Sequence, residues 1–166
     1  MKVAAISLVV VGLVSFAPAQ SLKAQASKFD SIISHAMMKK DMKTLEKLLK
    51  AGVTSDFVYV EDGQKQNFAQ MFANMKQGIG MMKSFKVCSA HSSNIKEKGN
   101  KGSGMTTHTM IGTTTGPDKK THVMNFVGTS TDTYVKVGGQ WKMSRMEMKT
   151  TKMTMDGKPM PGMGGK

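Results

Sequence analysis

The spacing of apolar residues changes once along this chain, and that change limits what the chain can fold into. In residues 29–80 the apolar positions recur three and four residues apart, which is the period of an amphipathic helix. In residues 83–155 they alternate with polar residues among threonines, valines and glycine turns, which is the period of a strand. Helices followed by strands are typical of an α+β protein with one antiparallel sheet, and we expect that class here.

The helical part predicts three helices. The second begins at Asp41, whose carboxylate can accept hydrogen bonds from free backbone N–H groups, and it ends at Gly52. The third is expected to end where Gly78 and Gly80 interrupt it. The apolar stripes of the three helices are Phe29, Ile32, Ile33, Ala36 and Met37, then Leu45, Leu48 and Leu49, then Phe68, Met71, Phe72 and Met75.

A short strand is predicted at residues 56–61, ending at an Asp62-Gly63 turn. The second half then predicts a meander of four long strands, of which the last two are joined by a Gly138-Gly139 turn. Several exceed the common strand length, so we expect them to be bent or bulged. Their predicted ranges are 84–97, 103–115, 119–137 and 140–155.

The first nineteen residues have the three parts of a secretory signal peptide. A basic start at Lys2 precedes an apolar run over residues 3–16, and a small-x-small site ends at Ala19. Cleavage after Ala19 would remove 19 of the 166 residues and leave 147, so a secreted or periplasmic protein is predicted, with an uncleaved anchor as the alternative. We expect a signal peptide at 1–19, one domain at 20–155, and a flexible tail rich in Met, Gly and Pro at 156–166.

The formal charge of +13 comes almost entirely from lysine, because Arg145 is the only arginine. Proteins that read nucleic-acid sequence usually place arginine forks on bases and stack aromatic rings on them, and aromatics make up only 6% of this chain. We therefore expect no sequence-specific nucleic-acid partner, and only weak attraction to polyanions.

Metal and cofactor signatures are absent from the sequence. The single cysteine, Cys88, lies in a predicted strand, where a small buried side chain is expected. No His-x-x-x-His pair, cysteine cluster or acidic loop is present, so we predict no metal centre and no cofactor. Methionine is abundant, however, and thioethers favour copper(I), which leaves copper(I) binding or sacrificial oxidation as alternatives. The methionines nearest the tail are Met146, Met148, Met153, Met155, Met160 and Met163.

Three sequence blocks suggest a family. Residues 40–45 (KDMKTL), 56–63 (DFVYVEDG) and the hairpin at 132–143 (DTYVKVGGQWKM) resemble the SnoaL-like branch of the nuclear-transport-factor-2-like superfamily, especially its small exported domains of unknown function. The resemblance implies a cone, in which a strongly curved antiparallel sheet wraps around three N-terminal helices and leaves a pocket at its open end. It also implies a possible homodimer through the sheet. Ketosteroid isomerase, polyketide cyclases, dehydratases and inert binding modules share this fold, so it does not by itself give a function.

Strand parity selects the candidate pocket residues. With a two-residue turn at 138–139, Tyr134 faces Met143 and Asp132 faces Arg145 across the final hairpin. Alternation then places six side chains on one face, which we predict to be the concave interior. Tyr59, from the short strand predicted at 56–61, is a further candidate for this interior. The six are Asp132, Tyr134, Trp141, Met143, Arg145 and Glu147.

Two aspartates are the candidate catalytic residues. By resemblance to the isomerase, Asp62 matches the general base and Asp132 matches the protonated acid. The isomerase's donor tyrosine, however, aligns near Ile33, which cannot donate a hydrogen bond, and a lost oxyanion donor costs about 3–4 kcal/mol in comparable sites. Asp132 can instead pair with Arg145, which would keep it ionised, and Asp62 can be an ordinary turn residue.

Two hypotheses from different classes follow. The first is a non-catalytic exported domain that binds a small apolar or amphipathic molecule in its pocket, or that self-associates. The second is an isomerase- or cyclase-type enzyme in which Asp62 or Asp132 abstracts a proton beside a carbonyl. Catalysis requires a buried carboxylate that is free of Arg145 and close to a hydrogen-bond donor.

Overall fold

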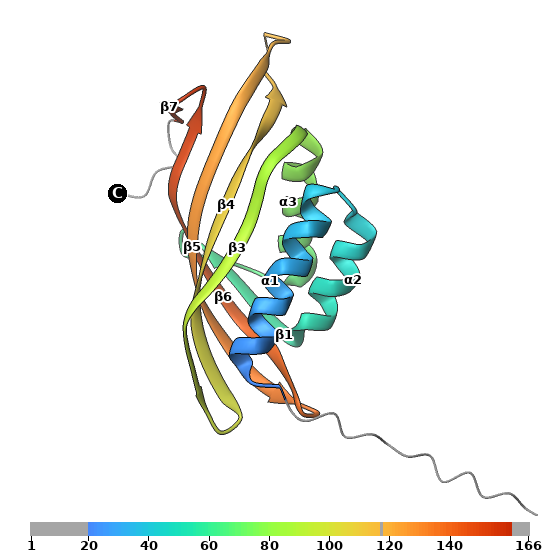
Figure 1. Ribbon diagram of the computed structural model, residues 1–166, viewed down its shortest axis with the longest axis vertical. Helices are drawn as coiled ribbons and strands as arrows, with labels where there is room; N and C mark the ends of the chain where they lie inside the picture. The colour runs from blue at the N-terminus through green and yellow to red at the C-terminus, as the bar shows by residue number, and fades with distance from the viewer. Residues whose placement is uncertain (1–19, 117, 161–166) are drawn as a thin grey trace, which may run out of the picture.

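The computed structural model describes residues 20–116 and 118–160, in which three helices pack on a seven-stranded sheet (Figure 1). The predicted α+β class is confirmed. The predicted signal peptide at 1–19 and residues 161–166 of the predicted tail lie outside the described residues. None of the described helices is long and apolar enough to cross a membrane. The elements are α1 (Leu22–Met38), α2 (Met42–Gly52), β1 (Val53–Glu61), β2 (Gln64–Gln66), α3 (Phe68–Met81), β3 (Met82–Lys98), β4 (Lys101–Thr115), β5 (Thr121–Val137), β6 (Gln140–Met155) and β7 (Lys158–Pro159).

Each helix begins at a side chain that caps it. The Ser21 hydroxyl accepts from the Ala24 amide at 3.2 Å, and the Asp41 carboxylate accepts from the Thr44 amide at 3.0 Å, as predicted for α2. Asn67 caps α3 through a reciprocal capping box with Gln70.

The predicted end of α3 at its glycines is wrong, because the helix continues through Gly78 and Gly80 to Met81. Glycine in a helix interior costs about 0.5–1 kcal/mol relative to alanine, which is too little to end a helix whose other face is well packed. That packing comes from Met71, Phe72 and Ile79, which are all buried.

The strands form one curved, open sheet in the order β2-β1-β6-β5-β4-β3, with β7 paired to β6. Its four long strands form the predicted antiparallel meander. The prediction of a purely antiparallel sheet is wrong at one pair, because β1 runs parallel to β6, with Val53 opposite Met143 and Tyr59 opposite Met146. Both strands start at the same end of the sheet, β1 after α2 and β6 after the 138–139 turn, so they enter side by side in the same direction.

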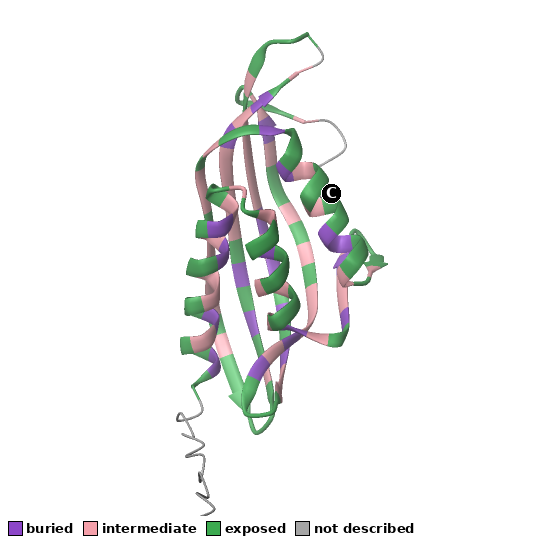
Figure 2. Ribbon diagram, turned by 90° about the vertical axis from the view of Figure 1, so that its right-hand side faces the viewer, coloured by how far each residue is buried: buried purple, intermediate pink, exposed green. Residues whose placement is uncertain are grey.

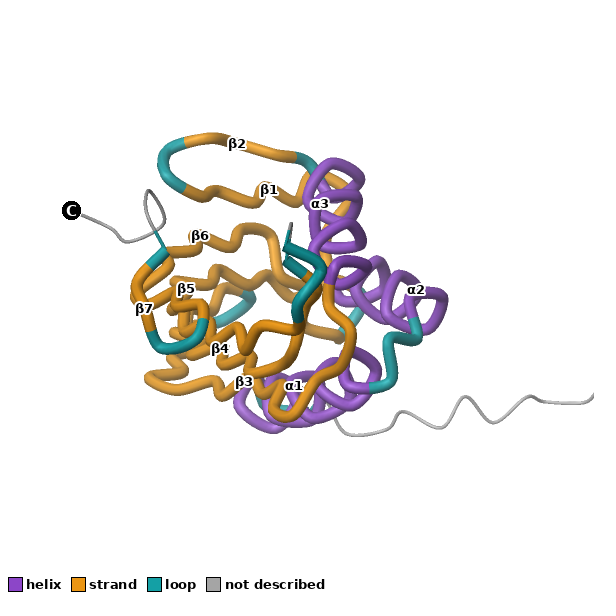
Figure 3. Tube along the Cα trace, turned by 90° about the horizontal axis from the view of Figure 1, so that it is seen from above, coloured by secondary structure: helices purple, strands orange, loops and turns teal. Residues whose placement is uncertain are grey.

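The long strands carry the irregularities that their length predicts. Register shifts occur at two points in the β5–β6 pair, between Val127 and Gly128 and between Thr133 and Tyr134, and at three points in the β3–β4 pair. Such bulges increase the local twist and bend a strand. Seen from above, the helices lie along one side of the curved sheet (Figure 3).

Helix α1 protects the exposed edge of β3. The backbone amides of Ala90 and Ser92 donate to Ser34 Oγ at 3.1 Å and to Asp30 Oδ2 at 2.8 Å. An edge strand with free N–H groups is a template for unwanted strand pairing. The polar side chains of α1 occupy these donors and fix the helix against the sheet.

The core has two apolar clusters between the helices and the sheet, where the buried residues in Figure 2 gather. One joins Leu22 of α1 and Met71 of α3 to the final hairpin and is built of Leu22, Val53, Phe57, Met71, Tyr134, Trp141 and Met143. The other joins the three helices and is built of Ile33, Ala36, Leu45, Phe72 and Ile79.

The end of the sheet farthest from the start of α1 is held by a histidine between two aspartates. His122 lies 2.6 Å from Asp156 through Nδ1 and 2.9 Å from Asp118 through Nε2. The hydrogen bonds to these carboxylates raise the pKa of His122, and the hydrogen bond to His122 lowers the pKa of each aspartate. These contacts, with β7, hold the described start of the predicted tail against the sheet.

Candidate functional site

A row of buried polar side chains crosses the inner face of the sheet, where a core would ordinarily be apolar. Strand register places Thr106 of β4 opposite Ser130 of β5, and Asp132 lies two residues further along β5 on the same face. The three residues are 4%, 1% and 0% exposed. Buried polar groups carry a large desolvation cost unless they are paired, so such a row requires a structural or functional explanation.

Asp132 is the centre of this row. Its Oδ2 atom accepts hydrogen bonds from the Thr106 hydroxyl at 2.6 Å and from the Tyr134 hydroxyl at 3.4 Å. Its Oδ1 atom is buried and has no hydrogen-bond partner among the described residues. Burial raises the pKa of Asp132, and the negative charge of Asp30 adds to that rise, while the hydrogen bonds oppose it. The carboxyl is therefore suited to carry a proton on Oδ1 and donate it.

The row continues to helix α1 and to a histidine. Ser92 Oγ lies 3.1 Å from Thr106 Oγ1, and the Ser92 amide donates to Asp30 of α1. On the other side His108 Nε2 lies 3.1 Å from Ser130 Oγ, and burial lowers the pKa of His108. We call this set the polar belt. Its members are Asp30, Ser92, Thr106, His108, Ser130 and Asp132.

Beyond the belt the same inner face becomes apolar and is only partly buried. Register places Met110, Phe126 and Met153 side by side on β4, β5 and β6. A side chain at Gly128 would meet Phe126 Cζ at 2.8 Å and Met148 Sδ at 3.1 Å, so these two side chains lie over the glycine. Methionine side chains are flexible and can repack around different shapes. We call this set the methionine face, which consists of Met110, Met124, Phe126, Met148, Met153 and Met155.

Tyr134, Trp141 and Met143 lie on the same side of the sheet, as strand parity predicts. They are 7%, 2% and 9% exposed and belong to the first core cluster, against which Tyr59 and Met146 pack. Tyr59 donates to Glu61 Oε2 at 3.0 Å, and burial raises its pKa. These residues form the packed base of the interior, and only the hydroxyl of Tyr134 reaches the polar belt.

The predicted pairing of Asp132 with Arg145 is wrong. The bulge between Thr133 and Tyr134 inserts Ser144 into β6, so Met146 lies opposite Asp132 and Arg145 lies opposite Thr133. One inserted residue reverses the face of the side chains that follow it, until a second register shift, between Val127 and Gly128, restores the alternation. Arg145 therefore points outward and forms a salt bridge with Glu147 at 2.9 Å, with side chains 40% and 56% exposed. Within the described part of the chain, Asp132 has no cationic partner.

Asp62, the other catalytic candidate, is exposed in the turn between β1 and β2. Its φ of 50° and that of Gly63 at 78° are the left-handed conformations of a tight hairpin turn. The structure does not bring Asp62 and Asp132 into contact. Ile33, which aligns near the isomerase's donor, packs in the second core cluster.

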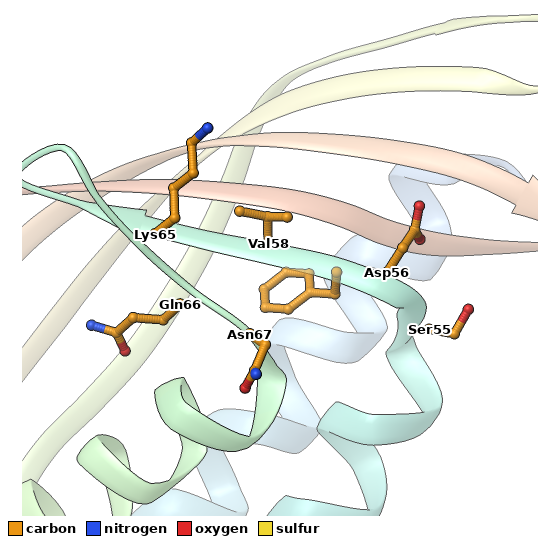
Figure 4. Close-up of a pocket in the computed structure, with 7 residues that line it drawn as sticks. Ser55, Asp56, Val58, Lys65, Gln66 and Asn67 are labelled. Atoms are coloured by element: carbon orange, nitrogen blue, oxygen red, sulfur yellow. The ribbon is translucent and has the colours of Figure 1, made fainter.

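A separate surface hollow lies beside β1, where the chain leaves β2 for α3 (Figure 4). It has a volume of about 310 Å³ and is open to solvent. Asp56 and Lys65 extend on the same side of the hairpin, and Gln66 and Asn67 lie below them in the view. Its side chains are not members of the polar belt, and among the described residues none of the buried side-chain atoms without a hydrogen-bond partner belongs to its lining.

Sequence reasoning missed most of the polar belt. Asp30, Thr106, His108 and Ser130 were not singled out, although they were visible as polar residues at inward positions of predicted elements. Pairing the predicted strands directly at 115 and 119 would have placed Thr106 opposite Gly128. The observed register pairs Thr115 with Thr121 and so places Thr106 opposite Ser130, which the sequence prediction did not include. The described residues contain no group of three or more His, Cys, Asp or Glu side chains arranged for a metal ion. Burial raises the pKa of the Cys88 thiol to about 11, and its Sγ lies 3.7 Å from Met37 Sδ.

Comparison with known proteins places the fold. No family model matches the chain, and no curated protein matches it in sequence. Among solved structures, a candidate scytalone dehydratase from Novosphingobium aromaticivorans is similar with a TM-score of 0.54 and 22% identity, over 78% of this chain and 83% of that one. A candidate dehydratase of the nuclear-transport-factor-2-like family from Streptomyces avermitilis is similar with a TM-score of 0.56 and 12% identity, over 75% and 93%.

A further structure from Novosphingobium aromaticivorans is described as a nuclear-transport-factor-2-like protein with a cystatin-like fold. It is similar with a TM-score of 0.51 and 10% identity, over 75% of this chain and 79% of that one. At these identities the similarity concerns the fold. The predicted resemblance is confirmed at that level: this chain has the nuclear-transport-factor-2-like α+β fold.

Proposed function

We propose that the protein binds a small, largely apolar molecule on the inner face of its sheet and holds one oxygen atom of that molecule at Asp132. The observation that carries this proposal is the Asp132 carboxyl, which is fully buried and has one oxygen without a partner among the described residues. The methionine face supplies an adaptable apolar surface next to this group. Small-molecule sites commonly combine such a surface with a few placed polar groups.

The protonation of Asp132 defines the kind of ligand. Because burial raises its pKa, Asp132 stays protonated at higher pH than an exposed aspartate and can donate to a carbonyl, ether or hydroxyl oxygen. An anionic ligand would place a buried negative charge near the half-buried Asp30, which is unfavourable. A neutral aromatic or alicyclic alcohol or ketone therefore fits the site better than a carboxylic acid.

The binding proposal is tested with two fluorescent probes that differ by one hydroxyl group, 2-naphthol and naphthalene. We expect the unchanged protein to bind 2-naphthol more tightly, and Asp132→Leu to weaken 2-naphthol binding about 10-fold, since a net hydrogen bond contributes about 0.5–1.5 kcal/mol. Naphthalene affinity should stay the same in Asp132→Leu. Glu147→Gln, on the outer face of the neighbouring strand, is the control and should bind both probes like the unchanged protein.

Two outcomes would contradict the proposal. If neither probe binds the unchanged protein, the methionine face is not a ligand surface for this class. If Asp132→Leu lowers the affinity for both probes equally, the residue supports packing and does not hold the oxygen. Thermal unfolding of the variant separates a loss of binding from a loss of fold.

A second candidate is proton transfer of the dehydratase or isomerase kind. Burial raises the pKa of Asp132 and lowers that of His108, and two perturbed groups in one belt are candidates for acid–base chemistry. Two of the similar structures are described as candidate dehydratases. The test is hydrogen–deuterium exchange beside the carbonyl of 2-tetralone in D₂O, followed by NMR. Exchange that is no faster with the protein than in buffer, or unaffected by His108→Gln, removes this candidate.

We also propose export, supported by the basic start, apolar run and small-x-small site of residues 1–19. Intact-mass measurement of the protein from its native cells should give the mass of residues 20–166, and the full mass of 166 residues would contradict cleavage. Homodimer formation through the sheet and copper(I) binding stay predictions. Met146, Met148, Met153 and Met155 lie at inner-face positions of β6 and not in a free tail.

A further inference from the structure

Three segments that are distant in sequence meet at one end of the molecule, the end where α1 begins. They are the first turn of α1, the turn between β3 and β4, and the turn between β5 and β6, all at the bottom of Figure 1. We call this region the basic end and define it as residues 21–25, 96–103 and 135–142. Its charged residues are Lys23, Lys96, Glu97, Lys98, Lys101, Lys136 and Lys142.

Specific contacts hold the three segments together. The Lys136 amide donates to the Asn100 carbonyl at 2.9 Å, which joins the two turns. Gln25 of α1 forms a pair of hydrogen bonds with the backbone of Trp141, at 2.5 Å to its carbonyl and 3.0 Å from its amide. The Leu22 amide donates to Glu97 Oε1 at 3.0 Å. The lysines are therefore carried by a rigid surface and not by independent loops.

The charge of the basic end is unbalanced. It holds six lysines and one acidic residue, and the carboxylate of that residue, Glu97, accepts the hydrogen bond from the start of α1. The start of a helix also carries partial positive charge. Lys96, Lys98, Lys101 and Lys23 are exposed, and a hollow of about 230 Å³ lies among the first three.

The opposite end of the sheet provides a contrast. Its turns carry Lys119, Lys120 and Lys158, but also Asp118 and Asp156, which both contact His122. The turns of the opposite end therefore have an excess of one lysine over acidic residues, whereas the basic end has an excess of five.

The shape of the basic end favours a membrane surface as partner. The lysines form a compact patch at the tip of the molecule, whereas a linear polyanion is usually bound along a stripe or groove.

We propose that the basic end docks this protein on anionic lipid membranes through lysine–phosphate attraction. This proposal is independent of the interior site. Docking end-on places the sheet upright and leaves the methionine face, towards the other end, free of the membrane. Clusters of lysine next to a bilayer bind anionic headgroups by long-range attraction that salt weakens.

The test measures how much protein sediments with lipid vesicles. It uses the chain that begins at Gln20, which contains every described helix and strand. Vesicles contain phosphatidylcholine alone or phosphatidylcholine with about 30% phosphatidylglycerol, a composition that gives a negative surface potential. We compare the triple variant Lys96→Gln, Lys98→Gln, Lys101→Gln with a matched triple at the opposite end, Lys119→Gln, Lys120→Gln, Lys158→Gln. Both triples change the net charge equally, so they separate the position of charge from its amount.

We expect the unchanged protein to bind only the anionic vesicles at about 20 mM salt and to be released at about 500 mM. The triple at the basic end should lower the partition coefficient about 100-fold, and the opposite triple less than about threefold. Equal loss in both triples, or no binding of the unchanged protein to anionic vesicles, overturns the proposal. The proposal is also overturned if the protein binds dextran sulfate through the same three lysines but does not bind the vesicles. Far-UV circular dichroism confirms that both triples keep the fold.

Discussion

Trp141→Ala is expected to lower the free energy of unfolding by about 3–5 kcal/mol, the usual cost of truncating a large buried aromatic residue. Trp141 is 2% exposed and packs in the first core cluster, between Leu22 of α1 and the strands of the final hairpin. Its backbone is held by Gln25, so the hairpin cannot easily collapse into the space that the indole leaves. The cavity therefore stays open in the variant.

Urea unfolding followed by far-UV circular dichroism measures this effect, because Trp141 is the only tryptophan and its fluorescence is lost in the variant. Val137→Ala is the control. Val137 lies in the same hairpin but is 50% exposed, so its truncation should change the free energy of unfolding by less than about 0.5 kcal/mol. A loss below about 1 kcal/mol for Trp141→Ala would contradict the packing described for the first core cluster.

Gly112→Ala is expected to cost about 3 kcal/mol or more, because the added methyl group meets backbone that cannot move aside. The new Cβ would lie 2.3 Å from the Ser84 carbonyl oxygen and 3.3 Å from Phe85 Cα, both on the neighbouring strand β3. Register shifts lie on either side of this point in the β3–β4 pair, so the close approach belongs to the bend of the sheet. The variant must either separate the strands or lose the bend.

Gly78→Ala in α3 is the matched control, and it is expected to change the stability in the opposite direction. No atom lies within 4 Å of an added Cβ at Gly78, so alanine should stabilise the helix by about 0.5–1 kcal/mol. Thermal unfolding of the two variants compares them under the same conditions. If both substitutions change stability in the same direction, the close approach at Gly112 is not what makes that glycine necessary.

The fold could be predicted well from the sequence because the apolar residues keep one spacing over long segments, and that spacing changes only once. The cap at Asp41, the 138–139 turn and the side shared by Tyr134 and Trp141 followed from local chemistry and strand alternation. The parallel β1–β6 pair could not be predicted in this way, because it joins segments far apart in sequence. The predicted end of α3 was wrong because tertiary packing outweighed the weak helix preference of Gly78 and Gly80.

The candidate site was only partly predictable. Asp132 was identified, but its partner was assigned to Arg145, because counting alternate residues from the 138–139 turn does not detect the inserted Ser144. Because of that one residue, the ion pair that was expected on the inner face is replaced by a buried carboxyl that has no cationic partner among the described residues. The rest of the polar belt depends on the β4–β5 register and on the packing of α1 against β3, and neither follows from periodicity.

The central claim is that the Asp132 carboxyl is buried, protonated at unusually high pH and available to a ligand oxygen. Its titration, followed by NMR of carbon-13-labelled aspartate and assigned with Asp132→Leu, measures this directly. We predict that the pKa of Asp132 lies above the ordinary 3.8. The stability that the protonated carboxyl contributes to the folded protein should then be complete at low pH and be lost as the pH rises through that raised pKa. We also predict that saturation with 2-naphthol shifts the Asp132 resonance. An Asp132 pKa at or below the ordinary value, with a resonance that 2-naphthol leaves unchanged, would contradict the account.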